Sequence, residues 1–201
     1  MRLIISTIID SLDTITERAG QLVSWLVLIL MALTLIVAVP RYLLSNEWFL
    51  ELHLFSLDWE AVRSVYSHYV NALGDSIQYV HAIIFMVGVS YALKQGDHVR
   101  IDIIYRSLKP RARAWINITG YFTLFFPTFI FLMVMSWPYV MNSWGVMESS
   151  ARPGGLPLIY LLKTFLLIMP AMMILQGIAQ MLRHIQILLQ EPNVMATEET
   201  A

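Results

Sequence analysis

Few side chains of this sequence could do chemistry inside a membrane. Apart from Lys94 and Arg183 at span ends, Lys163 is the only formal charge inside a predicted span, and His81 is the only histidine there. Gln78 and Gln176 are amides in two of the same segments. Polar groups at membrane depth often mark transport paths or cofactor ligands. These few groups form neither an acid–base cluster nor a metal-ligand set. The sequence therefore predicts no enzymatic activity, no metal site and no cofactor.

Haem is a cofactor that bundles of four membrane helices often hold, and it needs two facing histidines at membrane depth. His53 and His68 fall outside the apolar segments, and His98 and His184 fall at their edges. A haem held by this chain alone is therefore not expected. The alternative interpretation is a membrane anchor for a redox complex, with His81 as one haem ligand and a neighbouring subunit supplying the other. A third possibility is a membrane interaction protein of another kind.

The elements that hold these residues are four long stretches without Asp, Glu, Lys or Arg, at residues 19–40, 76–93, 114–147 and 164–182. About 20 apolar helical residues cross a hydrocarbon core of roughly 30 Å, and backbone groups in lipid must be paired within the helix. The sequence therefore predicts an all-α integral membrane protein. Its single domain, residues 1–190, has four transmembrane helices, at about 20–40, 76–94, 115–139 and 157–183.

Composition supports this fold class. The 201 residues are 58% hydrophobic and 13% charged, against about 25% charged residues in a soluble domain. The absence of cysteine excludes disulfides and thiol chemistry. With a net charge of −1 and no basic tract, nucleic acid is not an expected partner.

Basic residues lie mainly on one side of the four predicted spans. The side with both termini carries nine, namely Arg2, Arg18, Lys94, Arg100, Arg106, Lys109, Arg111, Arg113 and Arg183. The other side carries three, namely Arg41, Arg63 and Arg152. Because Lys and Arg are enriched in cytoplasmic loops, the sequence predicts that both termini are cytoplasmic.

Three flanking segments carry predictions of their own. Residues 2–18 combine apolar residues at helical spacing with Asp10 and Asp13, which predicts an amphipathic helix lying in the membrane interface. The outer loop, 41–75, mixes aromatic residues with acids, so it is expected to hold an amphipathic segment on the outer interface or on a partner subunit. Residues 191–201 are polar and are expected to form a disordered cytoplasmic tail.

Two features within the spans allow local predictions. Pro127 removes a helix hydrogen bond, so a kink in the third span is expected. Lys163 lies in the first turns of the fourth span, near the outer face. There it is expected either to anchor the helix at the interface by snorkelling or to make a fixed contact with Glu148 or a partner subunit.

Several short motifs resemble one known family. They are Gln-Tyr-Val-His-Ala at 78–82, Tyr-Ala-Leu-Lys at 91–94, Gly-Asp-His-Val-Arg-Ile-Asp at 96–102, Ser-Trp-Pro-Tyr at 136–139, Gly-Gly-Leu-Pro at 154–157 and Leu-Gln-Gly at 175–177. In this order, over about residues 20–185, they resemble the small membrane subunit (DctQ or Q type) of tripartite ATP-independent periplasmic (TRAP) transporters. That family often has Glu at the place of Asp75 and an aromatic residue at the place of Gln78.

The resemblance implies a subunit of the bacterial inner membrane that scaffolds and anchors a large, sodium-coupled M-type membrane subunit. It also implies a periplasmic substrate-binding protein that delivers an organic acid-like solute. Membrane lipids would surround the subunit. In this family the structural or partner-contacting candidates would be Asp75, Gln78, His81, His98, Arg100, Asp102, Glu148, Lys163 and Gln176.

His98, Arg100 and Asp102 alternate in a short segment just after the second predicted span. Arg100 can bind a carboxylate with two parallel hydrogen bonds, and Asp102 is within local reach. We interpret the three residues as a brace that fixes the turn between the second and third spans. Ordinary positive-inside charge explains Arg100 but neither His98 nor Asp102.

Overall fold

The computed structural model describes residues 2–46, 58–95 and 108–189 of the chain. These residues form helices joined by loops, with no strand among them. Four helical rods are each long and apolar enough to cross a membrane. The predicted all-α architecture with four spans is therefore confirmed.

The first helix, α1, runs without a break from Arg2 to Ser45. At 1.5 Å per residue its 44 residues extend about 66 Å, roughly twice the thickness of a hydrocarbon core. Pro40 lies inside α1, in its last turns, whereas the sequence predicted that the span ends there. The N-terminal amphipathic segment and the first span are thus one helix.

That segment also faces its neighbours in a way the sequence did not predict. Ile8 and Ile15 are exposed, whereas Ile9 and Thr16 are buried against the bundle. The inward face is therefore mixed, with the apolar Ile9 beside the polar Asp13 and Thr16, and Ile8 and Ile15 point outward. Whether it lies in the membrane interface stays a prediction.

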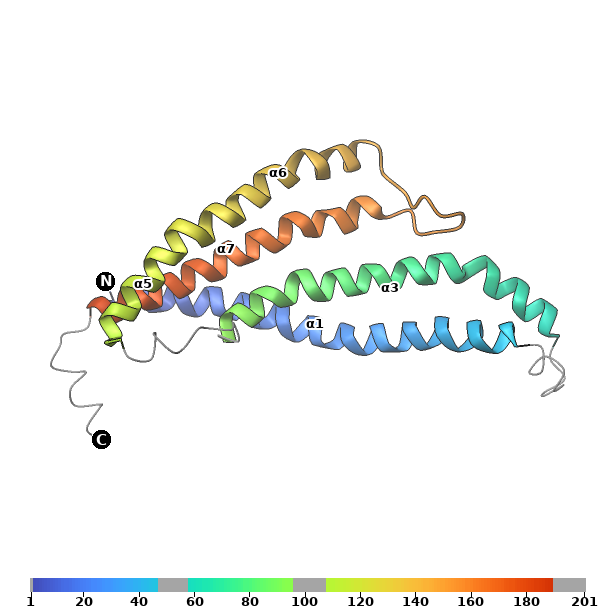
Figure 1. The fold of residues 1–201 in the computed structure, drawn as a ribbon, viewed down its shortest axis with the longest axis horizontal. Helices are drawn as coiled ribbons and strands as arrows, with labels where there is room; N and C mark the ends of the chain where they lie inside the picture. Colours follow the sequence, from blue (N-terminus) through green and yellow to red (C-terminus); the bar gives the residue numbers. More distant parts are fainter. Residues whose placement is uncertain (1, 47–57, 96–107, 190–201) are drawn as a thin grey trace, which may run out of the picture.

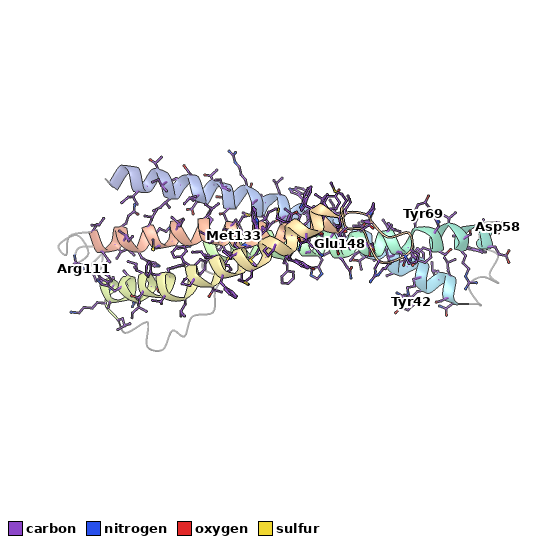
Figure 2. All side chains as sticks on the ribbon, turned by 90° about the horizontal axis from the view of Figure 1, so that it is seen from above. Tyr42, Asp58, Tyr69, Arg111, Met133 and Glu148 are labelled. Carbon is purple, nitrogen blue, oxygen red and sulfur yellow. The ribbon has the colours of Figure 1, made fainter. Side chains whose placement is uncertain are left out.

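The second helix, α3, runs from Trp59 to Gln95 and lies beside α1. It begins well before the predicted second span, because residues 59–75 of the outer loop continue the same helix. The Tyr66 hydroxyl donates to the Val37 carbonyl at 2.9 Å and ties the two helices together. Figure 1 shows this α1–α3 pair projecting beyond the other two rods, and Figure 2 places Tyr42, Asp58 and Tyr69 on the projection. The remaining loop residues, 47–57, lie outside the described part.

The third rod contains the irregularity that Pro127 predicted. It consists of α5 (Pro110–Gly120), the π-helical turn η2 (Tyr121–Phe125) and α6 (Phe126–Gly145). The Phe126 N–H donates to the Tyr121 carbonyl, five residues back. Pro127 has no N–H, and its ring would crowd the carbonyl four residues earlier, so the wider turn accommodates it. The rod curves between α5 and α6 (Figure 1).

The fourth rod, α7, runs from Ile159 to Leu189 and holds the fold together. It contacts α1, α3, α5 and α6, whereas α6 packs mainly on α7. Its side chains at Pro170, Met173, Gln176, Gly177 and Ala179 are buried. The helix order across the molecule is therefore α1, α3, α7 and α6 (Figure 1), which leaves long faces of α1, α3 and α6 open.

Candidate functional site

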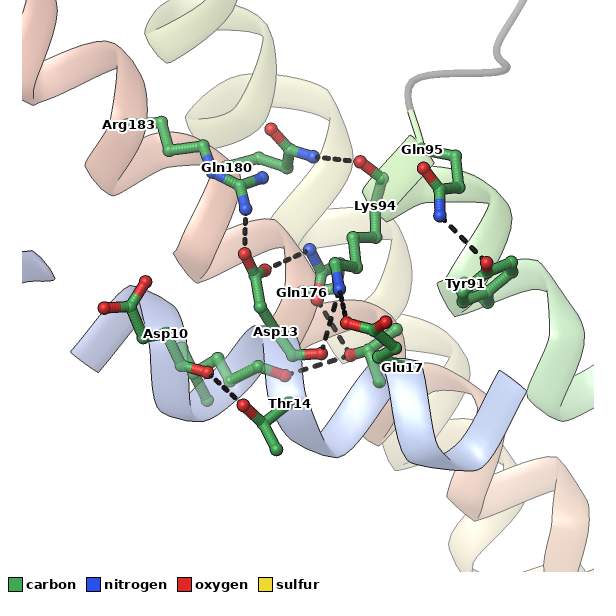
Figure 3. Close-up of polar contacts among 12 residues, drawn as sticks. Asp10, Asp13, Thr14, Glu17, Tyr91, Lys94, Gln95, Gln176, Gln180 and Arg183 are labelled. Atoms are coloured by element: carbon green, nitrogen blue, oxygen red, sulfur yellow. Dashed lines mark hydrogen bonds and ion pairs between the residues drawn. The ribbon is translucent and has the colours of Figure 1, made fainter. Parts of the chain in front are cut away.

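Polar contacts gather at two places, and the first is where the N-terminal part of α1 meets the C-terminal half of α7 (Figure 3). We call it the terminal cluster, and its members are Asp13, Thr16, Glu17, Lys94, Gln176 and Arg183. Asp13 of α1 forms an ion pair with Arg183 of α7. The Gln176 amide donates to Asp13 at 3.2 Å and accepts from the Thr16 hydroxyl at 2.8 Å. Gln176 is fully buried, so its amide locks α1 to α7 where no water can compete.

The same cluster also binds α3. The Lys94 ammonium donates to the Glu17 carboxylate at 2.7 Å and to the Asp13 carbonyl at 3.3 Å. Gln180 of α7 donates to the Leu93 carbonyl at 3.1 Å, and thereby satisfies one of the acceptors left open near the end of α3. Three helices that are distant in sequence therefore meet through paired polar groups.

The second place is around the loop between α6 and α7. We call it the loop cluster, and its members are Asp75, Glu148, Arg152, Leu156 and Lys163. Asp75 of α3 is only 4% exposed. Its carboxylate accepts from the Leu156 backbone N–H at 3.1 Å and from the Arg152 guanidinium at 3.3 Å. A Cβ on Gly155 would lie 2.5 Å from the same carboxylate, so glycine lets the loop approach α3 closely.

Glu148 and Lys163 form the other half of the loop cluster. The Lys163 ammonium donates to the Glu148 carboxylate, which also accepts from the Ser143 hydroxyl at 2.6 Å. The ammonium lies 4.0 Å from the centre of the Tyr139 ring, a favourable cation–π geometry. The structure thus places Lys163 in a fixed contact with Glu148, which was one of the two alternatives left open by the sequence.

Glu148 lies outside the spans, and its surroundings favour the ionised form. The hydrogen bond from Lys163, followed by the one from Ser143, lowers the pKa of the Glu148 carboxyl from its usual 4.5. Partial desolvation opposes this shift. At neutral pH the pair with Lys163 is therefore fully charged.

Two candidate residues belong to neither cluster. Gln78 and His81 lie on α3 with their side chains exposed on the outside of the bundle. His81 contacts the ring of Phe85, with the ring centres 5.2 Å apart. The candidates His98, Arg100 and Asp102 lie outside the described residues, so the brace between the second and third spans stays a prediction.

Most of the terminal cluster was not predicted from the sequence. Gln176 was singled out, but Asp13 and Arg183 were treated as ordinary flanking charges. Signals were present: Asp13 and Thr16 lie one turn apart on α1, and Gln176, Gln180 and Arg183 recur at helical spacing on α7. Such spacing predicts that polar groups share a face, but it does not identify the partner helix.

Neither cluster resembles a reaction centre. Within residues 2–46, 58–95 and 108–189, no group of three or more His, Cys, Asp and Glu side chains could hold a metal ion. Nothing in the described residues supports the redox-anchor alternative; the exposed His81 side chain contacts the ring of Phe85. The two clusters pair charges and fix helices.

Comparison with known proteins assigns the chain to a family. No curated protein and no solved structure matches it significantly. The sequence profile described as "Tripartite ATP-independent periplasmic transporters, DctQ component" matches residues 61–187, which is more than half of the 201-residue chain. The match covers nearly all of α3 and α7 and the whole third rod, and it leaves α1 outside. The chain therefore belongs to the DctQ family, and it is a multi-pass small membrane component of a TRAP transporter.

Proposed function

We propose that this chain is the static scaffold of its transporter. It anchors a large M-type membrane subunit that holds the substrate and coupling-ion sites. The proposal rests on the pairing of the charged side chains that face the interior of the bundle. Among the described residues of α1, α3 and α7, five charged side chains are buried or half-buried, and each lies in an ion pair: Asp13, Asp75, Lys94, Lys163 and Arg183.

A subunit that moved a solute would need polar groups that can exchange partners. Transporters bind ions and substrates near the bilayer centre, at interrupted helices with unpaired backbone groups. Here the paired charges lie outside the uncharged stretches 19–40, 76–93, 114–147 and 164–182, and most of them directly flank one of these stretches. The irregular turn η2 keeps a backbone hydrogen bond at its end. These features favour a rigid support.

The working cycle then depends on other components. In the proposed assembly a periplasmic substrate-binding protein delivers an organic acid-like solute, and a sodium gradient drives symport through the large subunit. This chain holds that subunit in the inner membrane. The nine-to-three distribution of basic residues supports cytoplasmic termini, which puts the terminal cluster on the cytoplasmic side and the loop cluster on the periplasmic side.

Reconstitution into liposomes tests the scaffold role. Vesicles would contain this chain alone, the large subunit alone, or both, with the binding protein and a panel of labelled organic acids outside. With an inward sodium gradient, we expect uptake from the pair and none from this chain alone. Uptake by this chain alone would overturn the proposal, and uptake by the pair that ignores sodium would overturn the ion assignment.

A further inference from the structure

The outward face of α3 carries a line of residues that includes polar side chains, which are unfavourable in contact with lipid. Gln78, His81 and Phe85 are the exposed residues of the uncharged stretch 76–93, and they follow one another at helical spacing. Gly88 continues the same line one turn further on. The stripe lies on the side opposite the buried residues Val87, Ser90 and Leu93. We call these four residues, Gln78, His81, Phe85 and Gly88, the α3 stripe.

His81 is the residue of the stripe whose polar groups most need a hydrogen-bonding partner. It follows Ser76 by five residues, so it lies about 7.5 Å along the helix from the edge of the uncharged stretch. Its side chain is too short to reach the headgroups in the way that lysine does. In the described part of the chain, the ring of Phe85 is the contact found for His81, and a ring supplies no full hydrogen bond. Facing hydrocarbon, its N–H and ring nitrogen would each lack a partner at a cost of several kcal/mol.

Gly88 points to a helix as the covering group. A Cβ built on Gly88 meets nothing within 4 Å, so the packing inside this chain does not need a glycine there. Small residues in membrane helices let a second backbone approach closely, and polar side chains nearby hydrogen-bond across the contact. The α3 stripe offers both features within about three turns.

We propose that the α3 stripe docks a transmembrane helix of the large subunit, which presents a hydrogen-bonding side chain at the level of His81 and packs closely over Gly88. This inference rests on the proposed function and names the surface that carries it.

A second copy of this chain fits the stripe less well. Two copies with the same orientation in the membrane would pair their α3 helices in parallel about a two-fold axis. Each Phe85, which is 69% exposed, would then meet its own copy at the same depth. The two rings would hold the helices apart within one turn of Gly88, where the missing side chain allows closeness. A different helix can place a small residue opposite Phe85 and a large one opposite Gly88.

Photo-crosslinking in the intact complex tests the proposal. Benzoylphenylalanine would replace Phe85 in the chain co-expressed with the large subunit, and in control chains it would replace Phe122 or Leu28, which are 73% and 58% exposed on other rods. We expect irradiation to link the Phe85 variant to the large subunit at least tenfold more efficiently than either control. Adducts to a second copy, or to lipid alone, would overturn the proposal.

A pair of glycine variants gives an independent test. Gly88→Leu is expected to reduce co-purification of the large subunit at least tenfold. Gly120→Leu is the control: a Cβ at either position meets nothing within this chain, but Gly120 lies outside the α3 stripe, so co-purification should be unchanged. Both variants should keep the thermal stability of the isolated chain. His81→Leu should weaken the complex about threefold, the usual size of one interhelical hydrogen bond in a membrane. Equal co-purification by the two leucine variants would overturn the proposal.

Co-purification distinguishes failure of the scaffold role from failure of the docking face. If the unmodified chain does not co-purify with the large subunit, the proposed function fails. If it co-purifies but neither the cross-link nor the Gly88 variant distinguishes the stripe, then the scaffold role stands and the docking face is wrong.

Discussion

The terminal cluster and the loop cluster tie the bundle in different ways. The terminal cluster joins residues 77 to 170 positions apart and brings α1, α3 and α7 together. In the loop cluster, Glu148 and Lys163 are only 15 positions apart and span one helical hairpin. Asp75 and Asn71 connect that loop to a more distant helix, α3. The terminal cluster therefore helps to determine that α1, α3 and α7 pack together, and the loop cluster mainly fixes the conformation of the loop between α6 and α7.

Burial sets one ion pair of the terminal cluster apart, because Asp13–Arg183 is the least exposed of the four pairs taken over both partners. Gln176 is fully buried in the terminal cluster, and Asp13 and Lys94 each have side chains 15% exposed. The other three pairs each join a buried side chain to an exposed one: Asp75 (6%) to Arg152 (53%), Lys163 (15%) to Glu148 (36%), and Lys94 (15%) to Glu17 (50%), whereas Arg183 beside Asp13 is 33% exposed. Exposed ion pairs contribute little because water competes for both partners. Disruption of the terminal cluster should therefore cost more stability than disruption of the loop cluster.

Asp13→Ala is the substitution for which we expect the largest loss of stability. Removing a partner from a buried pair costs about 3–5 kcal/mol. Because the Arg183 side chain is 33% exposed, we expect a loss of about 2–4 kcal/mol in the free energy of unfolding. Unfolding would be followed by circular dichroism as SDS is added to detergent micelles.

Asp10→Ala is the matched control, since Asp10 lies one turn earlier on α1 with an exposed side chain. It should change stability by less than about 0.5 kcal/mol. Exchanging the two charges, in Asp13→Arg combined with Arg183→Asp, should recover part of the loss. Equal stability of the Asp13→Ala and Asp10→Ala variants would refute the ranking of the two clusters.

Gly177→Ala sharpens the same comparison by testing packing beside the terminal cluster. A Cβ on Gly177 would overlap the ring of Phe125 in η2. That ring already contacts Tyr121, Phe126 and Phe129, so it has little room to move. We expect a loss of about 1–3 kcal/mol in the same unfolding assay.

Gly88→Ala is the control for that substitution, because the added Cβ meets nothing within 4 Å. It should leave the stability of the isolated chain unchanged or slightly raised, since alanine favours helix. A Gly177→Ala variant as stable as Gly88→Ala would mean that η2 yields easily and that α7 is not tightly held against it.

The sequence was sufficient for the spans because hydrocarbon imposes a length and a composition on each of them. The number of spans follows from four runs without charge, and each run lies largely within one of the four helical rods. The helices extend beyond those runs, from Arg2 at one end of α1 and from Trp59 at the start of α3. Outside hydrocarbon the apolar rule no longer marks where a helix ends, so these extensions could not be read from composition.

The candidate site was less predictable for a different reason. The contact of Lys163 with Glu148 could be named in advance as one alternative because both residues flank one short connection. Asp13 and Gln176 are separated by 163 positions, and their meeting depends on how α1 and α7 cross. One-dimensional spacing gives the face of a helix on which a residue lies, but the crossing depends on packing along the whole rod.

Asp75 provides the next test, within the loop cluster. Replacing it with Ala leaves the Leu156 N–H without its acceptor and removes the partner of Arg152. We expect a loss of about 1–2 kcal/mol and faster proteolysis within residues 146–158. Arg152→Ala should cost less than about 1 kcal/mol, because an exposed ion pair contributes little. A larger effect from Arg152 than from Asp75 would show that the surface charge organises the loop.

The smallest effect should come from acidification at Glu148. Its pKa is lower in the folded protein than the usual 4.5, so the unfolded chain takes up the proton first. The contribution of Glu148 is therefore fully present above about pH 4.5 and is lost as the pH falls through the lower folded value. The difference in melting temperature between the wild-type chain and Glu148→Gln should be constant from pH 7 to about pH 5 and shrink below that. Because Glu148 is partly exposed, we expect that difference to stay within about 2 °C. A difference that grows on acidification would mean that Glu148 is protonated in the folded chain and that Lys163 is held by another group.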